Sequence, residues 1–167
     1  MTRIEVIQAD ITRLPADAIV NAANSSLLGG GGVDGAIHRA AGPDLLHECR
    51  LLGGCKTGTA KLTKGYQLPA QYIIHTVGPV WNGGSKNEEN FLAQCYEQCL
   101  LIALEKGIKT IAFPNISTGI YGFPKDKAAA IAWQTVRAFI ESDPDALDTI
   151  SFVCFDAENY SLYRQLL

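Results

Sequence analysis

The chain has 167 residues, of which 47% are hydrophobic, and a formal net charge of -3. This length, with hydrophobic residues spread throughout, predicts one domain covering residues 1–167. The 14 Lys and Arg form no run or stripe, which argues against general nucleic-acid binding. The sequence contains no run of 18 consecutive apolar residues, the length that a membrane-spanning helix needs.

Residues Met1–Val6 lack the long apolar core of a signal peptide, so we expect a soluble protein in the cytoplasm. Five cysteines are an odd number without secretory context, which predicts reduced thiols. Cys95 and Cys99 lie one helical turn apart, but no His-x3-His or Cys-x2-Cys pair completes a tetrahedral site. We therefore predict buried structural cysteines and no metal site.

Strand and helix patterns alternate along the chain. In chain order, the apolar periodicities predict a strand at 3–8, a turn at 10–15, a strand at 18–21, helices at 34–41 and 43–52, strands at 59–63 and 72–77, a helix at 87–106, a strand at 110–113, a helix at 125–141, a strand at 149–155 and a helix at 157–167. This alternation favours an α/β fold, a three-layer α/β/α sandwich with a mixed, mainly parallel central sheet.

Two glycine-rich loops each follow a predicted strand and precede a predicted helix. The first runs from Asn21-Ala22-Ala23-Asn24 through Gly29–Gly35, and the second is Ile116–Gly122. Each offers bare backbone N–H groups at a helix N-terminus, which is the geometry that binds phosphate. Ligands of such sheets bind beyond the carboxyl ends of the strands, so we expect both loops to face one crevice and to grip a diphosphate.

Other nucleotide and nucleophile motifs are weaker. Gly30-x-Gly32-x-x-Gly35 satisfies the dinucleotide-binding pattern, but the acid expected about 20 residues later is missing from Arg50–Cys55, which argues against a nicotinamide enzyme. Lys56-Thr57 lacks the preceding glycine of a Walker motif. Ser117 lies in no G-x-S-x-G elbow and has no evident His partner, so we interpret its hydroxyl and amide as phosphate donors.

Four motifs follow one another along the chain: Asn21-Ala22-Ala23-Asn24, the glycine run with Val33-Asp34-Gly35-Ala36-Ile37-His38, His75-Thr76-Val77-Gly78-Pro79, and Ile116-Ser117-Thr118-Gly119-Ile120-Tyr121-Gly122. Together they resemble the macrodomain family, specifically its MacroD-type branch with the bacterial O-acetyl-ADP-ribose deacetylases and mono-ADP-ribosyl hydrolases. The resemblance covers essentially the whole chain. Asn115 and Lys56 depart from it, standing where a small residue and often proline are expected, and they bear only on fine specificity.

The resemblance implies an adenine end and a diphosphate clamp. Asp10 is expected to accept the adenine 6-amino group and the Ile11 amide to meet a ring nitrogen, while Phe155 packs near the adenine. Alternatively, Asp10 only caps a turn and Phe155 is a plain core aromatic. The diphosphate is expected to be surrounded by the backbone groups of Gly32, Val33, Ser117, Thr118, Gly119, Ile120 and Tyr121. Glycine is needed in these loops because a Cβ would block the close approach of the backbone to the phosphates.

The resemblance also implies a distal-ribose end. Asn24 is expected to bind the ribose hydroxyls, Tyr121 to cover the ribose, and Asp34 to bind the same region or orient a water. As alternatives, Asn24 ties its own loop through an Asx turn, and Asp34 is the N-cap of a helix beginning at Gly35, a role that can coexist with the first. His75 lies in an apolar strand and is interpreted as a satisfied core histidine.

These expectations predict a hydrolase that cleaves an ester on the distal ribose of an ADP-ribose group, with Asp34 and Asn24 as catalytic residues. The substrate is O-acetyl-ADP-ribose, a protein mono-ADP-ribosylated on acidic side chains, or both. No cofactor is expected, because backbone amides already neutralise the diphosphate. The alternative is a reader or regulatory module that binds ADP-ribose without turnover. The sequence leaves open the physiological ester, the carbon that water attacks, the oligomeric state and any regulatory or RNA-related partner.

Overall fold

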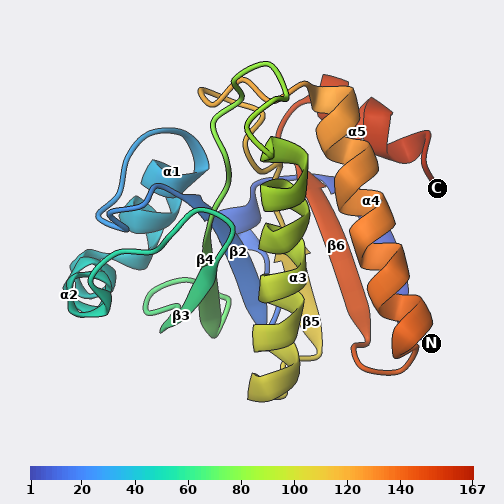
Figure 1. Ribbon diagram of the computed structural model, residues 1–167. Coiled ribbons are helices and arrows are strands. Elements are labelled where there is room, and N and C mark those ends of the chain that lie inside the picture. The colour runs from blue at the N-terminus through green and yellow to red at the C-terminus, as the bar shows by residue number, and fades with distance from the viewer.

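The computed structural model describes residues 1–167, and its centre is a six-stranded sheet in the order β1-β6-β5-β2-β4-β3 (Figure 1). The strands are β1 (Arg3–Gln8), β2 (Ala18–Ala23), β3 (Ala60–Lys64), β4 (Tyr72–Val77), β5 (Thr110–Phe113) and β6 (Thr149–Cys154). All neighbouring pairs are parallel except β3 with β4. The expected mixed, mainly parallel sheet is confirmed.

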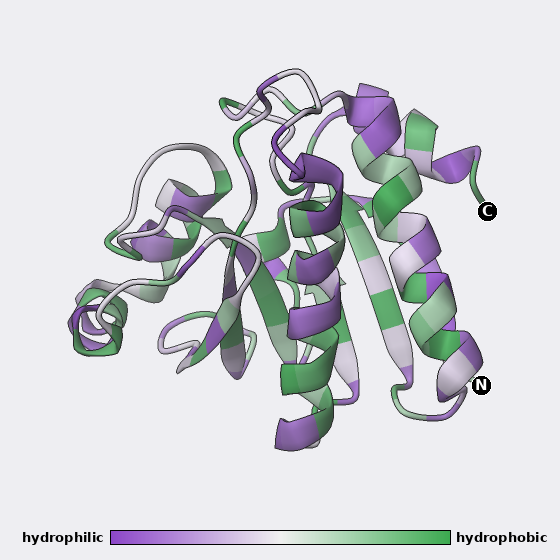
Figure 2. Cartoon of the chain, in the orientation of Figure 1, coloured by the Kyte–Doolittle hydropathy of each residue, from purple (hydrophilic) through white to green (hydrophobic).

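Helices cover both faces of this sheet. They are α1 (Gly32–Ala41), α2 (Pro43–Leu52), α3 (Glu88–Lys106), α4 (Lys125–Ser142) and α5 (Ala157–Arg164), with a short 3-10 helix η1 (Ile11–Arg13). One hydrophobic cluster joins α3, α4 and α5 to the sheet, and a second joins α1 and α2 to the opposite face. Figure 2 shows strands rich in hydrophobic residues behind helices with hydrophilic outer surfaces. The three-layer α/β/α architecture is therefore confirmed.

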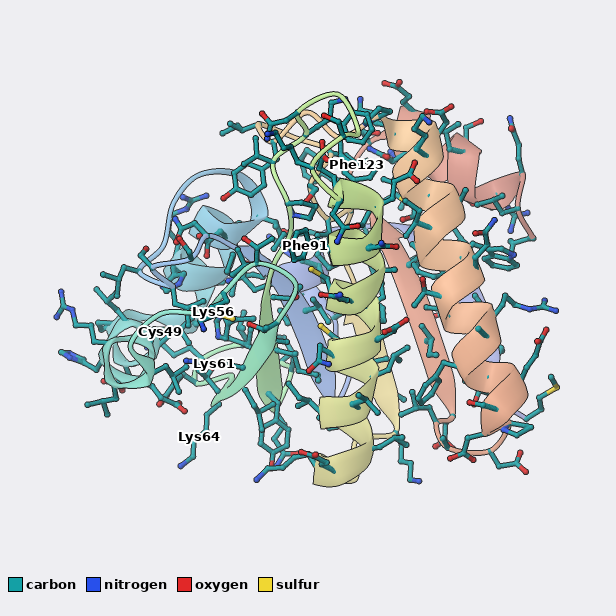
Figure 3. All side chains as sticks on the ribbon, viewed as in Figure 1. Cys49, Lys56, Lys61, Lys64, Phe91 and Phe123 are labelled. Carbon is teal, nitrogen blue, oxygen red and sulfur yellow. The ribbon has the colours of Figure 1, made fainter.

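The edge strand β3 carries two lysines, whereas its neighbour β4 carries no lysine or acidic residue. Lys61 and Lys64 extend from it (Figure 3), and charged side chains on an edge strand discourage pairing with another chain. Lys61 Nζ also donates to the Leu52 carbonyl at 2.9 Å, at the C-terminal end of α2. This contact ties the edge of the sheet to the layer formed by α1 and α2.

Most element boundaries agree with the prediction to within two residues, and two differences matter for the site. The strand β2 continues to Ala23, because Ala22 and Ala23 pair with Thr76 and Val77 of β4. The helix α1 begins at Gly32 with Gly31 as N-cap. The prediction that Asp34 is the N-cap of this helix is therefore wrong, and Asp34 lies within its first turn. Two other elements end early: β6 ends at Cys154, one residue before the predicted end, and α5 ends at Arg164, three residues before it.

The cysteines behave as predicted: all five are free and buried. No helix has both the length and the apolar composition needed to cross a membrane.

Candidate functional site

A pocket of about 700 Å³ lies beyond the carboxyl ends of the parallel strands. Segments that follow β1, β2, β4, β5 and β6 all contribute to its wall. Its lining includes every residue that the sequence pointed to: Asp10, Ile11, Asn24, Gly32, Val33, Asp34, Ser117, Thr118, Gly119, Ile120, Tyr121 and Phe155. The two glycine loops thus face one cavity, whose size suits a nucleotide-sized ligand. The individual roles of these residues stay predictions.

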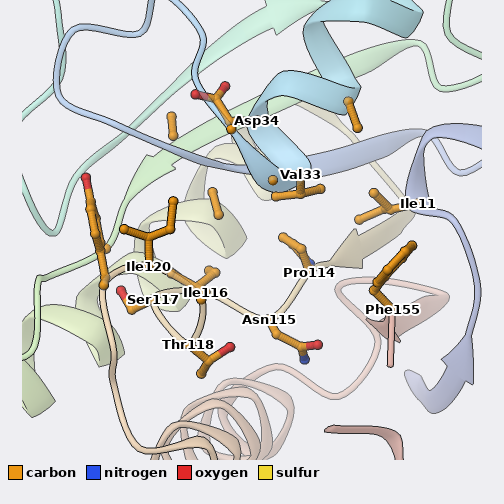
Figure 4. A pocket seen from close by; sticks show the side chains of 18 of the residues that line it. Ile11, Val33, Asp34, Pro114, Asn115, Ile116, Ser117, Thr118, Ile120 and Phe155 are labelled. Carbon is orange, nitrogen blue, oxygen red and sulfur yellow. The ribbon is translucent and has the colours of Figure 1, made fainter. Parts of the chain in front are cut away.

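The pocket has two chemically different ends. Figure 4 shows Ile11 and Phe155 together at one end and Asp34 toward the other, with Val33 between them and the second glycine loop across the pocket from Asp34. An apolar and aromatic end suits a flat base, whereas a carboxylate suits a polar or reacting group. A single ligand that carries a base at one end and a polar or reacting group at the other would place the part that links them in the middle of the pocket.

The first turn of α1 supplies free backbone donors to the middle of the pocket. The N–H groups of Gly32, Val33 and Asp34 have no acceptor in the chain, because the first bond of this helix is donated by Gly35 to the Gly31 carbonyl at 3.2 Å. Gly32 has a φ of 57°, in the left-handed region that favours glycine. The free donors coincide with the positive end of the helix dipole, so this turn favours an anion.

The second glycine loop supplies a further set of free donors. None of the amides from Ser117 to Tyr121 has an acceptor in the chain, while the loop is closed by Gly122 N–H to Gly119 O and by Phe123 N–H to Ser117 O, both at 3.0 Å. Ser117 has a φ of 66°, a conformation that costs a non-glycine residue of order 1–2 kcal/mol. Strain of this kind persists where a loop conformation is held by its surroundings.

Neighbouring segments hold the second loop in place. The Trp81 amide donates to the Tyr121 carbonyl at 2.8 Å, and the rings of Trp81 and Phe123 pack with centroids 4.7 Å apart. A Cβ built on Gly78 would overlap the Ser117 hydroxyl, so the segment after β4 approaches this loop as closely as only glycine allows. The free amides are therefore fixed in space before any ligand arrives.

Asp34 is the buried carboxylate of the pocket, with 4% of its surface exposed. The Asn21 side-chain amide donates to its Oδ1 at 2.9 Å, and His38 Nε2 lies 3.5 Å from the same oxygen. Burial raises the pKa of Asp34, and the Asn21 hydrogen bond and the nearby His38 oppose this shift. Oδ2 has no hydrogen-bond partner in the chain and lies beside Gly30, where a Cβ would come within 3.3 Å of it.

Asn24 lies on the other side of Gly30, since the same Cβ would come within 3.3 Å of Asn24 Nδ2. Its side chain donates to the Gly29 carbonyl at 2.9 Å and accepts from Ser26 Oγ at 2.8 Å and from the Leu27 amide at 3.2 Å. The alternative role of tying the loop to itself is therefore present in the structure. The amide and the Asp34 carboxylate still flank one small space of the pocket.

At the apolar end, Asp10 caps η1 through Oδ1, which accepts from the Thr12 amide at 3.0 Å and the Thr12 hydroxyl at 2.7 Å. These bonds lower the pKa of Asp10, and the capping alternative is thus realised at the pocket wall. Phe155 is 84% exposed, so its interpretation as a core aromatic is wrong. An exposed aromatic ring on a pocket wall is available for stacking against a base.

Sequence reasoning did not assign the two residues that contact Asp34. His38 follows Asp34 by one helical turn, and this i,i+4 spacing was a readable signal. Asn21 was visible only as part of a motif, because its contact with Asp34 depends on how α1 packs over β2. The lining also contains polar or charged side chains that were not assigned to the site, those of Arg39, Asn115, Lys125, Asp156 and Asn159. No three His, Cys, Asp or Glu side chains are grouped as a metal site would require.

Comparisons with known proteins agree on one family. The Macro domain profile matches residues 20–132. O-acetyl-ADP-ribose deacetylase 1 of Pantoea vagans is 56% identical, with 100% of this chain and 99% of that protein covered. ADP-ribose glycohydrolase MACROD2 of Xenopus laevis is 54% identical over 99% of this chain and 40% of its own length. The Trypanosoma brucei macrodomain in complex with ADP-ribose has a TM-score of 0.93 and 48% identity, covering 98% of this chain and 68% of that one. The chain therefore belongs to the Macro domain family.

Proposed function

We propose that the protein is a hydrolase that binds an ADP-ribose group and cleaves an ester on its distal ribose. The substrates are O-acetyl-ADP-ribose, proteins mono-ADP-ribosylated on acidic side chains, or both. The observation that carries this proposal is a buried carboxylate, Asp34, at one end of a pocket whose middle is lined by free amides from two loops. The names of relatives more than 50% identical, a deacetylase and a glycohydrolase, support it.

The proposed binding mode follows the chemistry of the pocket wall. The adenine packs between Ile11 and Phe155 with its 6-amino group toward Asp10. The diphosphate accepts from the amides of α1's first turn and from those of Ser117–Tyr121. The distal ribose then reaches the space beside Gly30, between Asn24 and Asp34, where Tyr121 covers it. Binding energy from the base and the diphosphate fixes the position of the ester, so no covalent anchor is needed.

In the proposed reaction, Asp34 Oδ2 orients a water molecule and accepts its proton as the water attacks the ester. Oδ2 suits this role because Oδ1 is already held by Asn21, which leaves one oxygen free. Burial raises the pKa of Asp34 and so makes its carboxylate a stronger base. A positioned base of this kind contributes about 10²–10⁴-fold to the rate. When water attacks the ribose carbon, the leaving group is a carboxylate, which needs little acid assistance. When water attacks the acyl carbon, the ribose oxygen leaves and takes up a proton, and the proton that Asp34 accepted from the water can return to it.

The test is to incubate the purified protein with O-acetyl-ADP-ribose and with a protein mono-ADP-ribosylated on glutamate, and to measure the ADP-ribose released. We expect turnover by the wild type and a loss of about 10²-fold or more in Asp34→Asn. Calorimetric affinity for ADP-ribose should persist in this variant. Asp44→Asn, which changes an exposed carboxylate in the first turn of the neighbouring helix α2, is the matched control.

Equal turnover by the wild type and Asp34→Asn would remove Asp34 from the mechanism. Tight ADP-ribose binding without any turnover by the wild type would instead favour the reader function. We further propose that residues 1–167 act as one macrodomain in the cytoplasm. The free, buried state of all five cysteines fits a reducing compartment.

A further inference from the structure

A chain of buried polar side chains crosses the face of the sheet that α1 and α2 cover. Asn21 of β2 and His75 of β4 are register partners and both are 0% exposed, and Thr63 of β3 is 1% exposed. Their neighbours on this face are apolar residues of one core cluster, among them Ile19, Ala23, Ile73 and Val77. Polar groups buried in such a layer lower stability unless they are hydrogen-bonded, so their arrangement calls for a physical reason.

The hydrogen bonds of this chain run in one direction. Burial lowers the pKa of His75 to about 3, so its ring is neutral at ordinary pH and carries one N–H. The Thr63 hydroxyl donates to the Lys64 carbonyl at 3.1 Å, which leaves its oxygen to accept from His75 Nε2 at 2.8 Å. His75 Nδ1 is then an acceptor, and it faces Asn21 Nδ2 at 3.1 Å.

The tautomer of His75 in turn fixes the amide of Asn21. Asn21 Nδ2 faces two acceptors, His75 Nδ1 and Asp34 Oδ1, whereas Asn21 Oδ1 is buried without any partner. The opposite amide orientation would set its carbonyl oxygen against the Asp34 carboxylate and against the Nδ1 lone pair. Leaving Asn21 Oδ1 buried and unpaired costs of order 1–3 kcal/mol. The amide keeps this orientation because only the Nδ2 hydrogens can be donated to the two acceptors, Asp34 Oδ1 and His75 Nδ1.

We propose that His75 and Thr63 are positioning residues for Asp34: they lock the Asn21 amide so that it always donates to Asp34 Oδ1. The consequence is that one carboxylate oxygen is held while Oδ2 stays free toward the pocket. This inference rests on the proposed role of Asp34 as the group that orients water. Neither His75 nor Thr63 lines the pocket, so both act only through Asn21.

Other ionisable groups also face Asp34. His38 lies one turn further along α1, and Cys49 of α2 is close enough for the two charges to influence each other. The Arg39 guanidinium lies over Gly35. Apart from Asp34 itself, the first glycine loop carries no ionisable side chain, and the second carries only the Tyr121 phenol. A change seen on removing His75 must therefore be compared with a variant that leaves all these groups in place.

The first test uses the wild-type protein without substrate. The ¹⁵N chemical shifts of the His75 ring should show a neutral imidazole protonated at Nε2 and unprotonated at Nδ1, unchanged from pH 8 to pH 5. A ring protonated at Nδ1, or one that takes up a second proton in this range, would overturn the proposal. Because no turnover is involved, this result is independent of whether the protein proves to be a hydrolase.

The second test compares His75→Leu with His75→Asn, whose amide oxygen can replace Nδ1 as the acceptor. In His75→Leu the Asn21 amide is released, so Asp34 loses its donor and becomes easier to protonate. We expect kcat at pH 6 to fall about tenfold, the fold-change that loss of a hydrogen bond to a charged group produces, with the acid limb of the pH profile moved to higher pH. His75→Asn should recover most of the loss, and KM and ADP-ribose affinity should change little in both.

The control is Thr76→Val, which removes a buried hydroxyl of the same strand whose bond goes to the Thr59 carbonyl at 2.9 Å. It should lower the melting temperature without moving the pH profile.

If His75→Leu does not fold, Thr63→Val tests the same chain, because it frees the His75 tautomer while leaving the ring in place. A folded His75→Leu or Thr63→Val with the wild-type pH profile of kcat would overturn the proposal, as would equal effects on kcat and on binding. In the absence of any wild-type turnover, the ¹³C titration of the Asp34 carboxyl replaces the rate as the readout, and an unshifted titration would overturn it.

Discussion

Gly119→Glu is expected to weaken ADP-ribose binding strongly, because it adds a carboxylate where the proposed clamp holds the diphosphate. Gly119 lies in the second glycine loop and lines the pocket. Its φ is outside the left-handed region, and a Cβ built on it meets nothing within 4 Å. A side chain at this position therefore fits without strain, and the substitution reports on charge rather than on folding.

The size of the effect follows from distance. The free amides on either side of Gly119 bring a bound phosphate close to the loop, so a glutamate carboxylate lies on the order of 6 Å from it. At that separation, two unit charges repel by about 0.7 kcal/mol in bulk water and about 2.8 kcal/mol at an effective dielectric constant of about 20. The second phosphate charge increases this repulsion, whereas the freedom of the side chain to turn toward water reduces it. We therefore expect a net repulsion of roughly 2 kcal/mol, which is about a 30-fold loss of affinity.

Isothermal titration calorimetry with ADP-ribose measures this loss, and Gly119→Gln is the control of equal size without the charge. The difference between the two variants should shrink as the salt concentration rises, because exposed charges are screened. Both should melt within a few degrees of the wild type. Wild-type affinity in Gly119→Glu would refute the reasoning and place the diphosphate away from the second loop.

Three further predictions follow from the same geometry. Phe155→Ala should leave stability nearly unchanged, since the ring is 84% exposed, but should weaken ADP-ribose binding by about 1–3 kcal/mol if the ring stacks on the base; unchanged affinity in calorimetry would contradict the stacking. Gly78→Ala should lower both the melting temperature and the affinity, because its Cβ would overlap the Ser117 hydroxyl; a variant that melts and binds like the wild type would contradict this. Burial raises the pKa of Asp34 above 3.8, so the folded protein holds the proton more tightly and loses stability as the pH rises between the unfolded and folded pKa values. Asp34→Asn should therefore melt above the wild type at pH 7 and lose this advantage below the unfolded pKa, and calorimetric melting at both pH values checks it.

The fold was predictable because local patterns and global architecture agree. The apolar run of β4 predicted a central strand, and five of its six residues are buried. Gly107 at the C-terminal end of α3 has the left-handed φ of 70° that such a helix end favours. The first turn of α1 was misjudged because Asp34 resembles an N-cap by composition, whereas the glycines before it let the chain enter the helix earlier.

The pocket wall was predictable to the extent that it is made of backbone. Glycine-rich loops after parallel strands signal free amides, and the amides of both loops lie at one cavity. The hydrogen bonds behind Asp34 could not be predicted in the same way. Asn21 and His75 are 54 residues apart, and their contact exists only because β2 and β4 pair in one register. Register between distant strands is set by packing of the whole sheet, which a single sequence does not display.

A carboxylate beside a diphosphate is expected to be repulsive, and the first turn of α1 shows how both are accommodated. Successive helix residues are rotated by about 100°, so the side chain of Asp34 turns toward β2 while the Gly32 and Val33 amides face the cavity. The positive end of the helix dipole favours both negative groups at once. Asn21 donates to the carboxylate oxygen on the sheet side, which leaves the other oxygen without a partner in the chain. The same helix terminus therefore attracts the substrate's charge and opposes the rise in the pKa of Asp34 that burial causes, at the end of the pocket where the ester is expected to lie.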